Sequence, residues 1–471
     1  QDNDEIIFAV TPFLVVILLL GFVFIATERI HHVNRAAVAM FVGVLCWLLY
    51  LGYGASYVRT QHLYEYSLFL HGAENSLGTI KEFIAKSVFM KYITDACELV
   101  LYILATMTIV EILNSNGCFD FLKPLLRTRK SQKMVWILAG VTFLVSANID
   151  NLTTTCLMLT VMHSVVANPR QRMVLGTIVV LSANAGGAFT VIGDVTSLML
   201  WIKGAVTPTA YSGMMVIPII VAMSIPIYMV SKMLPDRLAL VESIQRFSGV
   251  SDGWWYRAQR VIMGIVGIGG LWFIPTFHRI THLSPFVGAL CVLALLWIVN
   301  ELVNRTFLRA EKMVPKLFPQ SLEYANIQTM LFLIGVFLAV GAINETEASN
   351  AIWGFVDKYV GNSYILGALM GLLSSVLDST VVVISNLFFV PIESGQNVEY
   401  LNYMQNGSFW PFLSFCTAMG SSLFVLGSLA GIALMKRENV SIGWYIRFIS
   451  GKVLLGWLVG GVIFYLIAEY C

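Results

Sequence analysis

The ten residues "SANIDNLTTT", Ser146 to Thr155, place one aspartate between two asparagines, with three threonines after them, inside a long apolar run. "MVWILAGVTFLV" precedes this decapeptide, and "CLMLTVM" follows it. Apolar flanks of this length predict that the polar residues lie at bilayer depth, where an unpaired charge costs about 2.5–3.5 kcal/mol. Carboxylate and amide oxygens are what a hard cation prefers as ligands, so the decapeptide indicates an ion site.

The composition predicts an integral membrane protein. Of the 471 residues, 58% are hydrophobic and only 12% are charged, and the mean hydropathy is +0.78. A soluble domain carries about a quarter charged residues. Apolar stretches long enough to cross about 30 Å of hydrocarbon recur from end to end and leave no separate soluble domain, so membrane lipid is the expected surrounding. The net charge of +2 does not indicate a nucleic-acid partner, and the seven cysteines have no metal-ligand spacing.

Helix is the predicted state of every span, because lipid cannot satisfy backbone polar groups. We expect an all-α polytopic fold with about ten transmembrane helices, two re-entrant hairpins and two broken helices. Basic connections belong in the cytoplasm. They fall on one side only if 134–165 is a hairpin that enters and leaves from the cytoplasm and 362–391 is one that opens to the outside. The N-terminus is then external, and its acidic start "QDNDE", without an initiator methionine, suggests a removed signal peptide. The stretch 54–92 becomes an external interfacial segment, and the next helix is expected over 93–115.

An internal repeat accompanies this topology. "SANIDNLTTT" aligned on "SSVLDSTVVV", Ser374 to Val383, pairs Asp150 with Asp378. "NAGGAFTVIGDVTS", Asn184 to Ser197, aligns without gaps on "AMGSSLFVLGSLAG", Ala418 to Gly431. Each half therefore predicts three helices, a hairpin with an acid at its tip, a broken helix and a final helix, and five crossings per half invert the second copy. The predicted parts are a first repeat over 1–233 with broken helix 172–205, a cytoplasmic linker over 234–257, and a second repeat over 258–471 with broken helix 404–435.

The intramembrane acids are accompanied by neutral oxygens rather than by basic residues, which favours Na⁺ or another hard cation over an anion. We expect Na⁺ at Asp150, Asn151 and Asp194. The predicted ion-binding and proton-coupling residues are Ser146, Asn148, Asp150, Asn151, Thr153, Asn184, Asp194 and Thr196 in the first half, and Ser374, Asp378, Ser379, Thr380, Ser422 and Ser428 in the second.

Glycines are expected to shape the site. Gly186, Gly187 and Gly193 predict that the first broken helix unwinds there and exposes carbonyls to the ion, because glycine is unfavourable inside a helix. For Gly420 and Gly427 in the second half, close packing of helices is an equal alternative.

Coupling to protons follows from competition. A carboxylate that holds Na⁺ must be ionised, whereas an empty one in a low-dielectric setting readily takes a proton. Asp150 is the first candidate for this shared group and Asp194 the second. Both also suit capping of a half-helix, which is compatible with ion binding. Glu98 and Glu111 lie about 20 Å apart along one predicted helix, so they cannot share an ion, and both proton access and a structural role stay open.

Enzyme chemistry is not expected, because the sequence has neither H-E-x-x-H nor G-x-S-x-G, and no cofactor is predicted. The tryptophans and tyrosines are interpreted mostly as belts at the membrane interfaces.

"SANIDNLTTT" and "NAGGAFTVIGDVTS", together with "TMTIVEIL" (Thr106 to Leu113) and "HVNRAAVAMF" (His32 to Phe41), resemble the NhaD family of sodium/proton antiporters. This family belongs to a wider ion transporter superfamily that includes dicarboxylate and arsenite carriers. The resemblance implies an elevator-like fold with two hairpins, an inner-membrane location, a homodimer, and exchange of Na⁺ or Li⁺ for H⁺ in pH homeostasis. A Na⁺-coupled carrier of a dicarboxylate or other oxyanion stays as the alternative, although acids at the hairpin tips would repel such a substrate.

Overall fold

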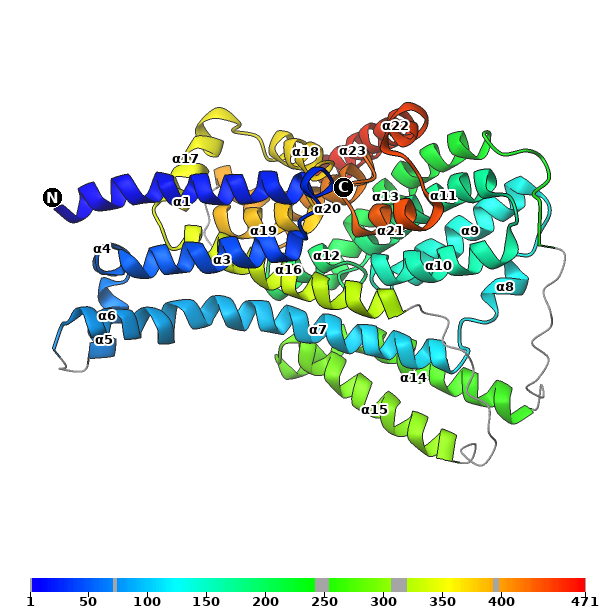
Figure 1. Ribbon diagram of the computed structural model, residues 1–471, viewed down its shortest axis with the longest axis horizontal. Helices are drawn as coiled ribbons and strands as arrows, with labels where there is room; N and C mark the ends of the chain where they lie inside the picture. The colour runs from blue at the N-terminus through cyan, green and yellow to red at the C-terminus, as the bar shows by residue number, and fades with distance from the viewer. Residues whose placement is uncertain (1, 71–73, 242–253, 306–319, 393–397, 471) are drawn as a thin grey trace. The chain divides into compact units, whose positions relative to one another are not determined.

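The computed structural model describes residues 2–70, 74–241, 254–305, 320–392 and 398–470, and Figure 1 shows that these ranges are helical. Eight of the described helices are long and apolar enough to cross a membrane. Shorter apolar helices lie at Val10–Ala26, Ser131–Ser146, Ser363–Ser374 and Ser379–Phe389. The prediction of an all-α polytopic membrane protein is therefore confirmed. Of the predicted linker 234–257, residues 242–253 lie outside the described ranges.

The chain divides into two compact units that do not follow its two halves. Unit 1 takes residues 1–100, 320–366 and 380–392, and unit 2 takes 101–319, 367–379 and 393–471. Each unit thus collects segments from both predicted repeats.

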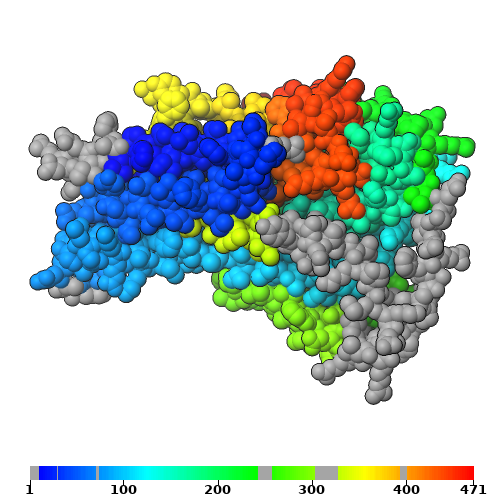
Figure 2. Space-filling model, viewed as in Figure 1, coloured from blue at the N-terminus to red at the C-terminus, as the bar shows by residue number. Residues whose placement is uncertain are grey.

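Unit 1 is built around the pairing of α3 (Arg35–Gly52) with α16 (Gln320–Asn344), and α1 (Asp2–Ala26) lies against α3 (Figure 1). A Cβ at Gly43 would stand 2.7 Å from the carbonyl oxygen of Gly335, so small residues bring these two backbones together. The helices α1 and α3, blue in Figure 2, contain large apolar side chains that are exposed, among them Phe13, Phe41 and Leu48. Unit 1 also contains α2 (Glu28–His31), α4 (Gly54–Gln61), α5 (Leu63–Leu70), α6 (Leu77–Phe83), a π-helical turn (Ile84–Val88), the start of α7 (Phe89–Ser115), α17 (Ala348–Tyr359) and nearly all of α19 (Ser379–Phe389).

The expected boundary of the third span is wrong. One helical run extends from α6 through the π-helical turn to the end of α7, covering Leu77–Ser115, and therefore starts well before residue 93. The short helices α4 and α5 are what remains of the predicted interfacial segment.

Unit 2 contains three helix pairs whose members are separated by short breaks. α9 (Ser131–Ser146) and α10 (Asn151–Val165) form the first hairpin, and α11 (Pro169–Phe189) and α12 (Val195–Ile202) form the first broken helix. The second broken helix is α20 (Phe409–Gly420) and α21 (Leu429–Glu438). Unit 2 also contains most of α7, α8 (Leu122–Leu125), α13 (Pro208–Ser231), α14 (Trp254–Thr281), α15 (Pro285–Arg305), most of α18 (Ser363–Ser374), a 3₁₀ helix (Val398–Tyr403), α22 (Ile442–Tyr445), a π-helical turn (Ile446–Ser450) and α23 (Gly451–Tyr470).

Residues 236–241, here called the strap, join the two ends of the first hairpin. Ser131 N donates to Asp236 O at 3.1 Å and Leu238 N donates to Arg129 O at 2.9 Å, at the start of α9. Ala167 N donates to Ala239 O at 2.8 Å and Val241 N donates to Val165 O at 3.0 Å, at the end of α10. Because one six-residue segment bonds both ends, the hairpin begins and ends at the same end of unit 2.

Candidate ion-binding site

The tip of the first hairpin is held by side chains of its own and of the first broken helix. Asp150 caps α10, and its Oδ1 accepts from Thr153 N at 2.9 Å. Ser146 Oγ donates to the carbonyl of Ala183 in α11 at 2.6 Å. Thr190 Oγ1 donates to Ala147 O at 2.5 Å. Ser146 and Thr190 therefore hold the tip against α11, whereas Asp150 and Thr153 fix the start of α10.

The break between α11 and α12 ends at a second aspartate cap. Asp194 is 8% exposed; its Oδ1 accepts from Val195 N at 2.9 Å and its Oδ2 from Thr196 Oγ1 at 2.6 Å. A Cβ at Gly193 would stand 2.7 Å from the carbonyl oxygens of both Gly187 and Ser146, so only glycine fits. The break thus turns the Asp194 carboxylate to the N-terminus of α12, where the helix dipole favours negative charge.

The predicted unwinding at Gly186 and Gly187 is wrong. Both residues lie inside α11, which continues to Phe189, and only Gly193 lies in the break. A Cβ at Gly186 would stand 2.3 Å from the carbonyl oxygen of Phe143. These two glycines therefore serve close packing of α11 rather than exposure of carbonyls.

Asn184 joins three parts of unit 2. Its side chain lies in α11, is 2% exposed, and donates through Nδ2 to Ser422 Oγ at 2.9 Å and to Ser428 Oγ at 3.1 Å. Its Oδ1 faces Asn151 Nδ2 at 3.4 Å. The hairpin tip and both broken helices therefore meet at one amide, and four predicted site residues come together there.

The second half repeats two of these contacts, one with the same residue type and one with a different one. Ser374 Oγ donates to Thr417 O at 2.8 Å, as Ser146 does to Ala183 O. Ser428 caps α21 by accepting from Gly431 N at 3.0 Å, and a Cβ at Gly427 would stand 2.1 Å from Ser374 O. The cap that is an aspartate in the first broken helix is thus a serine in the second.

Three acids share this part of unit 2. Asp378 is 5% exposed and directly precedes α19. Asp194 lies within electrostatic reach of both Asp150 and Asp378. The hydrogen bonds given above for Asp150 and Asp194 come from N–H and hydroxyl donors, which leaves their negative charge to be balanced by a cation or a proton. Across the described ranges no three His, Cys, Asp or Glu side chains form a metal cluster. The oxygens around Asp150 and Asp194 belong to carboxylates, amides and hydroxyls, which suit a hard cation.

The remaining predicted residues make other contacts or lie on other helices. Asn148 donates to Leu144 O at 2.7 Å and accepts from Trp272 of α14, so its amide is used outside the cluster around Asn184. Ser379 and Thr380 are buried in the first turn of α19, and Ser379 N donates to Gly427 O in the second break at 3.3 Å. Glu98 and Glu111 are half-buried on α7, which is continuous between them and keeps them about 20 Å apart.

Two buried tyrosines were not anticipated, and the interpretation of tyrosines as interfacial belts is wrong for them. Tyr211 OH donates to Ala188 O at 2.7 Å, beside the first break, and Tyr445 OH donates to Ser422 O at 2.8 Å, in the second. Each follows its cap, Asp194 or Ser428, at the same distance along the chain. That regularity is the sequence signal that could have found them.

Two buried hydroxyls were also missed. Thr155 lies one turn beyond Asn151 on α10, and Ser182 precedes Asn184 on α11. Neither hydroxyl oxygen has a hydrogen-bond partner among the residues the structure describes. They offer further neutral oxygens close to the predicted ligands.

An ion network also connects the far ends of these helices. Glu438, at the end of α21, is 7% exposed and accepts from Arg172 Nε of α11 at 2.9 Å. His163 Nδ1 of α10 lies 3.1 Å from its other oxygen. This contact fixes α10, α11 and α21 to one another, and so supports the geometry of the site from a distance.

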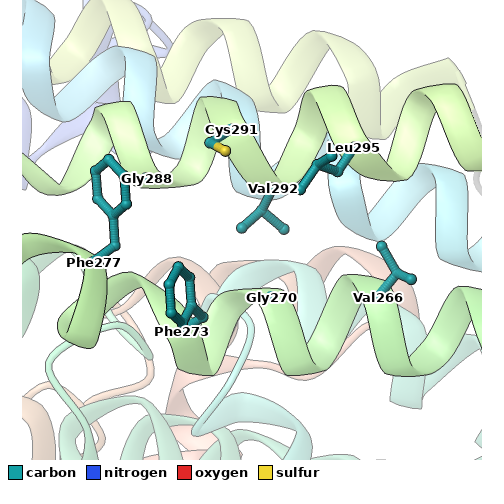
Figure 3. A pocket seen from close by; sticks show the side chains of 8 residues that line it. All are labelled: Val266, Gly270, Phe273, Phe277, Gly288, Cys291, Val292 and Leu295. Carbon is teal, nitrogen blue, oxygen red and sulfur yellow. The ribbon is translucent and has the colours of Figure 1, made fainter.

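A separate cavity of about 150 Å³ lies between α14 and α15 (Figure 3). Its walls are apolar, with Phe273 and Phe277 from one helix and Cys291, Val292 and Leu295 from the other. Such a lining offers no ligands to Na⁺, so this cavity is not the ion site.

Known proteins resemble the chain along most of its length. The family described as "CitMHS: Citrate transporter" matches residues 7–396. "Sodium/proton antiporter 1" of Arabidopsis thaliana is 31% identical over 78% of this chain and 61% of its own length. "Sodium/proton antiporter 2" of the same plant is 28% identical over 78% of this chain and 84% of its own length. "Na(+)/H(+) antiporter NhaD" of Vibrio cholerae is 27% identical over 75% of this chain and 74% of its own length. The resemblance to NhaD antiporters is therefore confirmed.

Proposed function

Because this chain belongs to the citrate transporter family of membrane carriers, we propose that it is a secondary active transporter, and that its exchanged ions are Na⁺ (or Li⁺) and H⁺. The plant and Vibrio relatives carry the names of antiporters and not of enzymes. The names of the plant and Vibrio relatives support sodium/proton exchange over citrate transport.

One observation carries the proposal. Asp150 and Asp194 cap helices that begin at neighbouring breaks, and Asn184 connects this region to Ser422 and Ser428 through neutral oxygens. Two carboxylates beside amides and hydroxyls supply the oxygen ligands that Na⁺ takes. We therefore assign Na⁺ to Asp150, Asn151 and Asp194, with Asn184 holding the ligands in place.

Coupling follows from charge. A negative charge at bilayer depth costs about 2.5–3.5 kcal/mol, so each empty carboxylate favours a proton and each Na⁺-bound one must release it. The two cargoes then exclude each other at the same oxygens. Asp194 lies within electrostatic reach of Asp150 and Asp378, and this repulsion makes two ionised acids without a cation still less favourable.

We also propose that the first hairpin is re-entrant and opens to the cytoplasm. The strap bonds both ends of the hairpin, which supports entry and exit on one membrane face. Basic residues near both ends support a cytoplasmic location of that face by the positive-inside rule: Arg129, Lys130 and Lys133 at one end and Arg170 and Arg172 near the other. The matching contacts of Ser146 and Ser374 support a second, inverted copy.

Citrate transport is the alternative that the family description favours. An anionic substrate would be expected at helix N-termini. The N-termini of α10 and α12 are already occupied by the carboxylates of Asp150 and Asp194, which would repel citrate. The site therefore fits a cation better than a tricarboxylate.

A proteoliposome assay separates the two functions. An imposed pH gradient is followed by a dye while NaCl, LiCl, KCl or sodium-free citrate is added. The proposal predicts that NaCl or LiCl dissipates the gradient, and that Asp150→Asn abolishes the response. Glu82→Gln, an exposed acid of α6, is the matched control and should exchange normally. Dissipation by citrate alone, or full Na⁺ exchange by Asp150→Asn, would contradict the proposal.

A homodimer in the inner membrane, with the N-terminus outside, stays a prediction. Cross-linking in native membranes tests the oligomer, and protease access to an N-terminal tag tests the orientation.

A further inference from the structure

Unit 1 contains a cluster of titratable side chains that ion exchange at Asp150 and Asp194 does not use. His62 follows α4, and its Nε2 lies 2.6 Å from Oε2 of Glu345, just beyond the end of α16. Its Nδ1 lies 3.1 Å from Oε2 of Glu65 on α5. Tyr92 OH of α7 donates to Oε1 of Glu345 at 2.5 Å, and Asn344 Nδ2 lies 2.9 Å from the same hydroxyl.

The hydrogen-bond partners of His62 indicate the protonation state of its ring. Both ring nitrogens face carboxylate oxygens, and an ionised carboxylate only accepts hydrogen bonds. A neutral imidazole donates from one nitrogen and presents a lone pair at the other, so it satisfies only one of the two acids. The imidazolium donates from both nitrogens, and therefore it is the form that fits this site.

The proton on His62 matters more to Glu345 than to Glu65, because Glu345 is the more deeply buried of the two. Glu345 is 6% exposed, whereas the Glu65 side chain is 67% exposed and can turn into water. A buried carboxylate without a positive partner is costly, because its negative charge has lost the water that stabilised it. Loss of the His62 proton therefore leaves Glu345 as the unbalanced group.

Several other titratable groups surround the His62–Glu345 pair. Among the described contacts of Glu345, only the one with His62 brings a positive charge to it. Tyr50 of α3 is fully buried, its hydroxyl is without a partner in the described part of the chain, and it interacts electrostatically with Glu345. Lys91 of α7 lies over the Tyr92 ring, 5.9 Å from its centroid. The titratable and charged groups around the pair are Tyr50, Tyr57, Glu65, Lys91, Tyr92 and Glu347.

The residue before His62 also bonds to the backbone beyond the end of α16. With its amide oriented to satisfy both atoms, Gln61 donates to Glu345 O at 2.9 Å and accepts from Glu347 N at 3.2 Å. The junction of α4 with α5 is thus bound to the end of α16 by these bonds and by the His62–Glu345 pair. Of the two, only the pair depends on a proton.

We propose that His62, Glu345 and Tyr92 form a second proton-binding site, separate from the ion site, in which a proton on His62 holds the α4–α5 junction against the end of α16. Removal of that proton in alkaline solution weakens this contact. The site makes unit 1 responsive to pH through residues that do not bind the transported ion.

The direction of the effect agrees with the environment of His62. The hydrogen bond to Glu345 raises the pKa of His62 above its ordinary value of 6.5, with burial opposing and Glu65 adding to the rise. A raised pKa in the bound state means that the contact is fully formed below the ordinary pKa and is lost as pH rises through the raised one. The response is therefore to alkaline and not to acid conditions.

Histidine titration in nanodiscs tests the site directly. Carbon-13 labelling of the imidazole rings gives seven histidine signals, and the one missing in His62→Gln belongs to His62. The proposal predicts a midpoint above 6.5 that falls in Glu345→Gln and falls less in Glu65→Gln. His282→Asn, an exposed histidine in a left-handed conformation that asparagine tolerates, is the control and should leave the midpoint unchanged.

Amide hydrogen exchange over 58–66 supplies a second readout. Protection in the wild type should drop above the His62 midpoint, beyond the ordinary pH dependence of exchange, and His62→Gln should lack that step. If Glu345→Gln does not fold, Glu65→Gln alone still decides, because its carboxylate is exposed. A His62 midpoint at or below 6.5, a midpoint that neither acid changes, or equal exchange profiles in wild type and His62→Gln would overturn the proposal. None of these outcomes depends on whether Na⁺ is the cargo.

Discussion

The two broken helices of unit 2 have the same backbone plan but different charge. In both, a glycine lies in the break against a serine carbonyl, Gly193 on Ser146 and Gly427 on Ser374. In both, the residue after that glycine caps the second half-helix, but this cap is Asp194 in the first and Ser428 in the second. Asn184 of the first has Ala418 as its counterpart in the second.

This difference shows how two helices with the same backbone arrangement can have unequal roles in ion binding. The repeated glycines and serines set the geometry, whereas the acid and the amide occur only in the first broken helix. The first therefore supplies charge and specificity, and the second supplies neutral oxygens that accept from Asn184. If that division is right, equivalent substitutions in the two helices must have unequal effects on ion exchange and equal effects on folding.

The largest expected effect is at the unequal caps. Asp194→Asn removes a charged ligand, and bonds to charged groups are worth about 1.5–3 kcal/mol, so the Na⁺ concentration for half-maximal exchange should rise about 10–100-fold. Ser428→Ala removes a neutral oxygen and should shift it by less than about tenfold. Exchange in proteoliposomes over a range of NaCl measures both. Equal shifts in the two variants would remove the distinction between the helices.

Folding should depend equally on the two glycines. Gly193→Ala and Gly427→Ala would place a Cβ 2.7 Å and 2.1 Å from backbone oxygens, and such overpacking costs about 1–3 kcal/mol. Thermal unfolding in detergent should show both as destabilised. Gly140→Ala on α9, where nothing lies within 4 Å, is the matched control and should be neutral or stabilising. An unchanged unfolding temperature in Gly193→Ala or in Gly427→Ala would contradict the view that both breaks depend on the same close packing.

Asn184→Ala should weaken Na⁺ dependence without abolishing exchange. The change leaves Ser422 and Ser428 without their amide donor, and an unsatisfied buried polar group costs about 1–3 kcal/mol. We expect the half-maximal Na⁺ concentration to rise about tenfold. Ala418→Ser, at the equivalent position of α20, should leave it nearly unchanged, and a larger effect there than at Asn184 would reverse the comparison.

The smallest expected effect is on the stability of the second cap. Ser428→Ala removes the N-cap bond to Gly431, and loss of such a cap costs about 0.5–2 kcal/mol. The melting temperature should fall slightly, and Ser428→Thr, which keeps the hydroxyl, should restore most of it. Absence of recovery in the threonine variant would show that the side chain acts by shape and not by capping.

Sequence patterns located the first hairpin, the two helix breaks and the acids, because each combines an apolar run with a local polar motif, whereas the second hairpin stays a prediction. They could not assign Gly186, since whether a glycine unwinds a helix or packs it depends on what stands opposite, here the Phe143 carbonyl. They also could not orient Asn148, whose amide oxygen accepts from Trp272, because the direction of this side chain depends on how the hairpin tip is rotated. The pair of His62 with Glu345 joins residues 283 positions apart, and no periodic pattern reports such a contact.

Proton release on Na⁺ binding tests the central claim most directly. Purified protein in lightly buffered detergent solution is given NaCl, and the pH of the solution is recorded. If Na⁺ and H⁺ compete for the carboxylates of Asp150 and Asp194, NaCl should acidify the solution in the wild type and should not do so in the Asp150→Asn, Asp194→Asn double variant. Sodium binding with no proton released, or equal release from the double variant, would contradict the account.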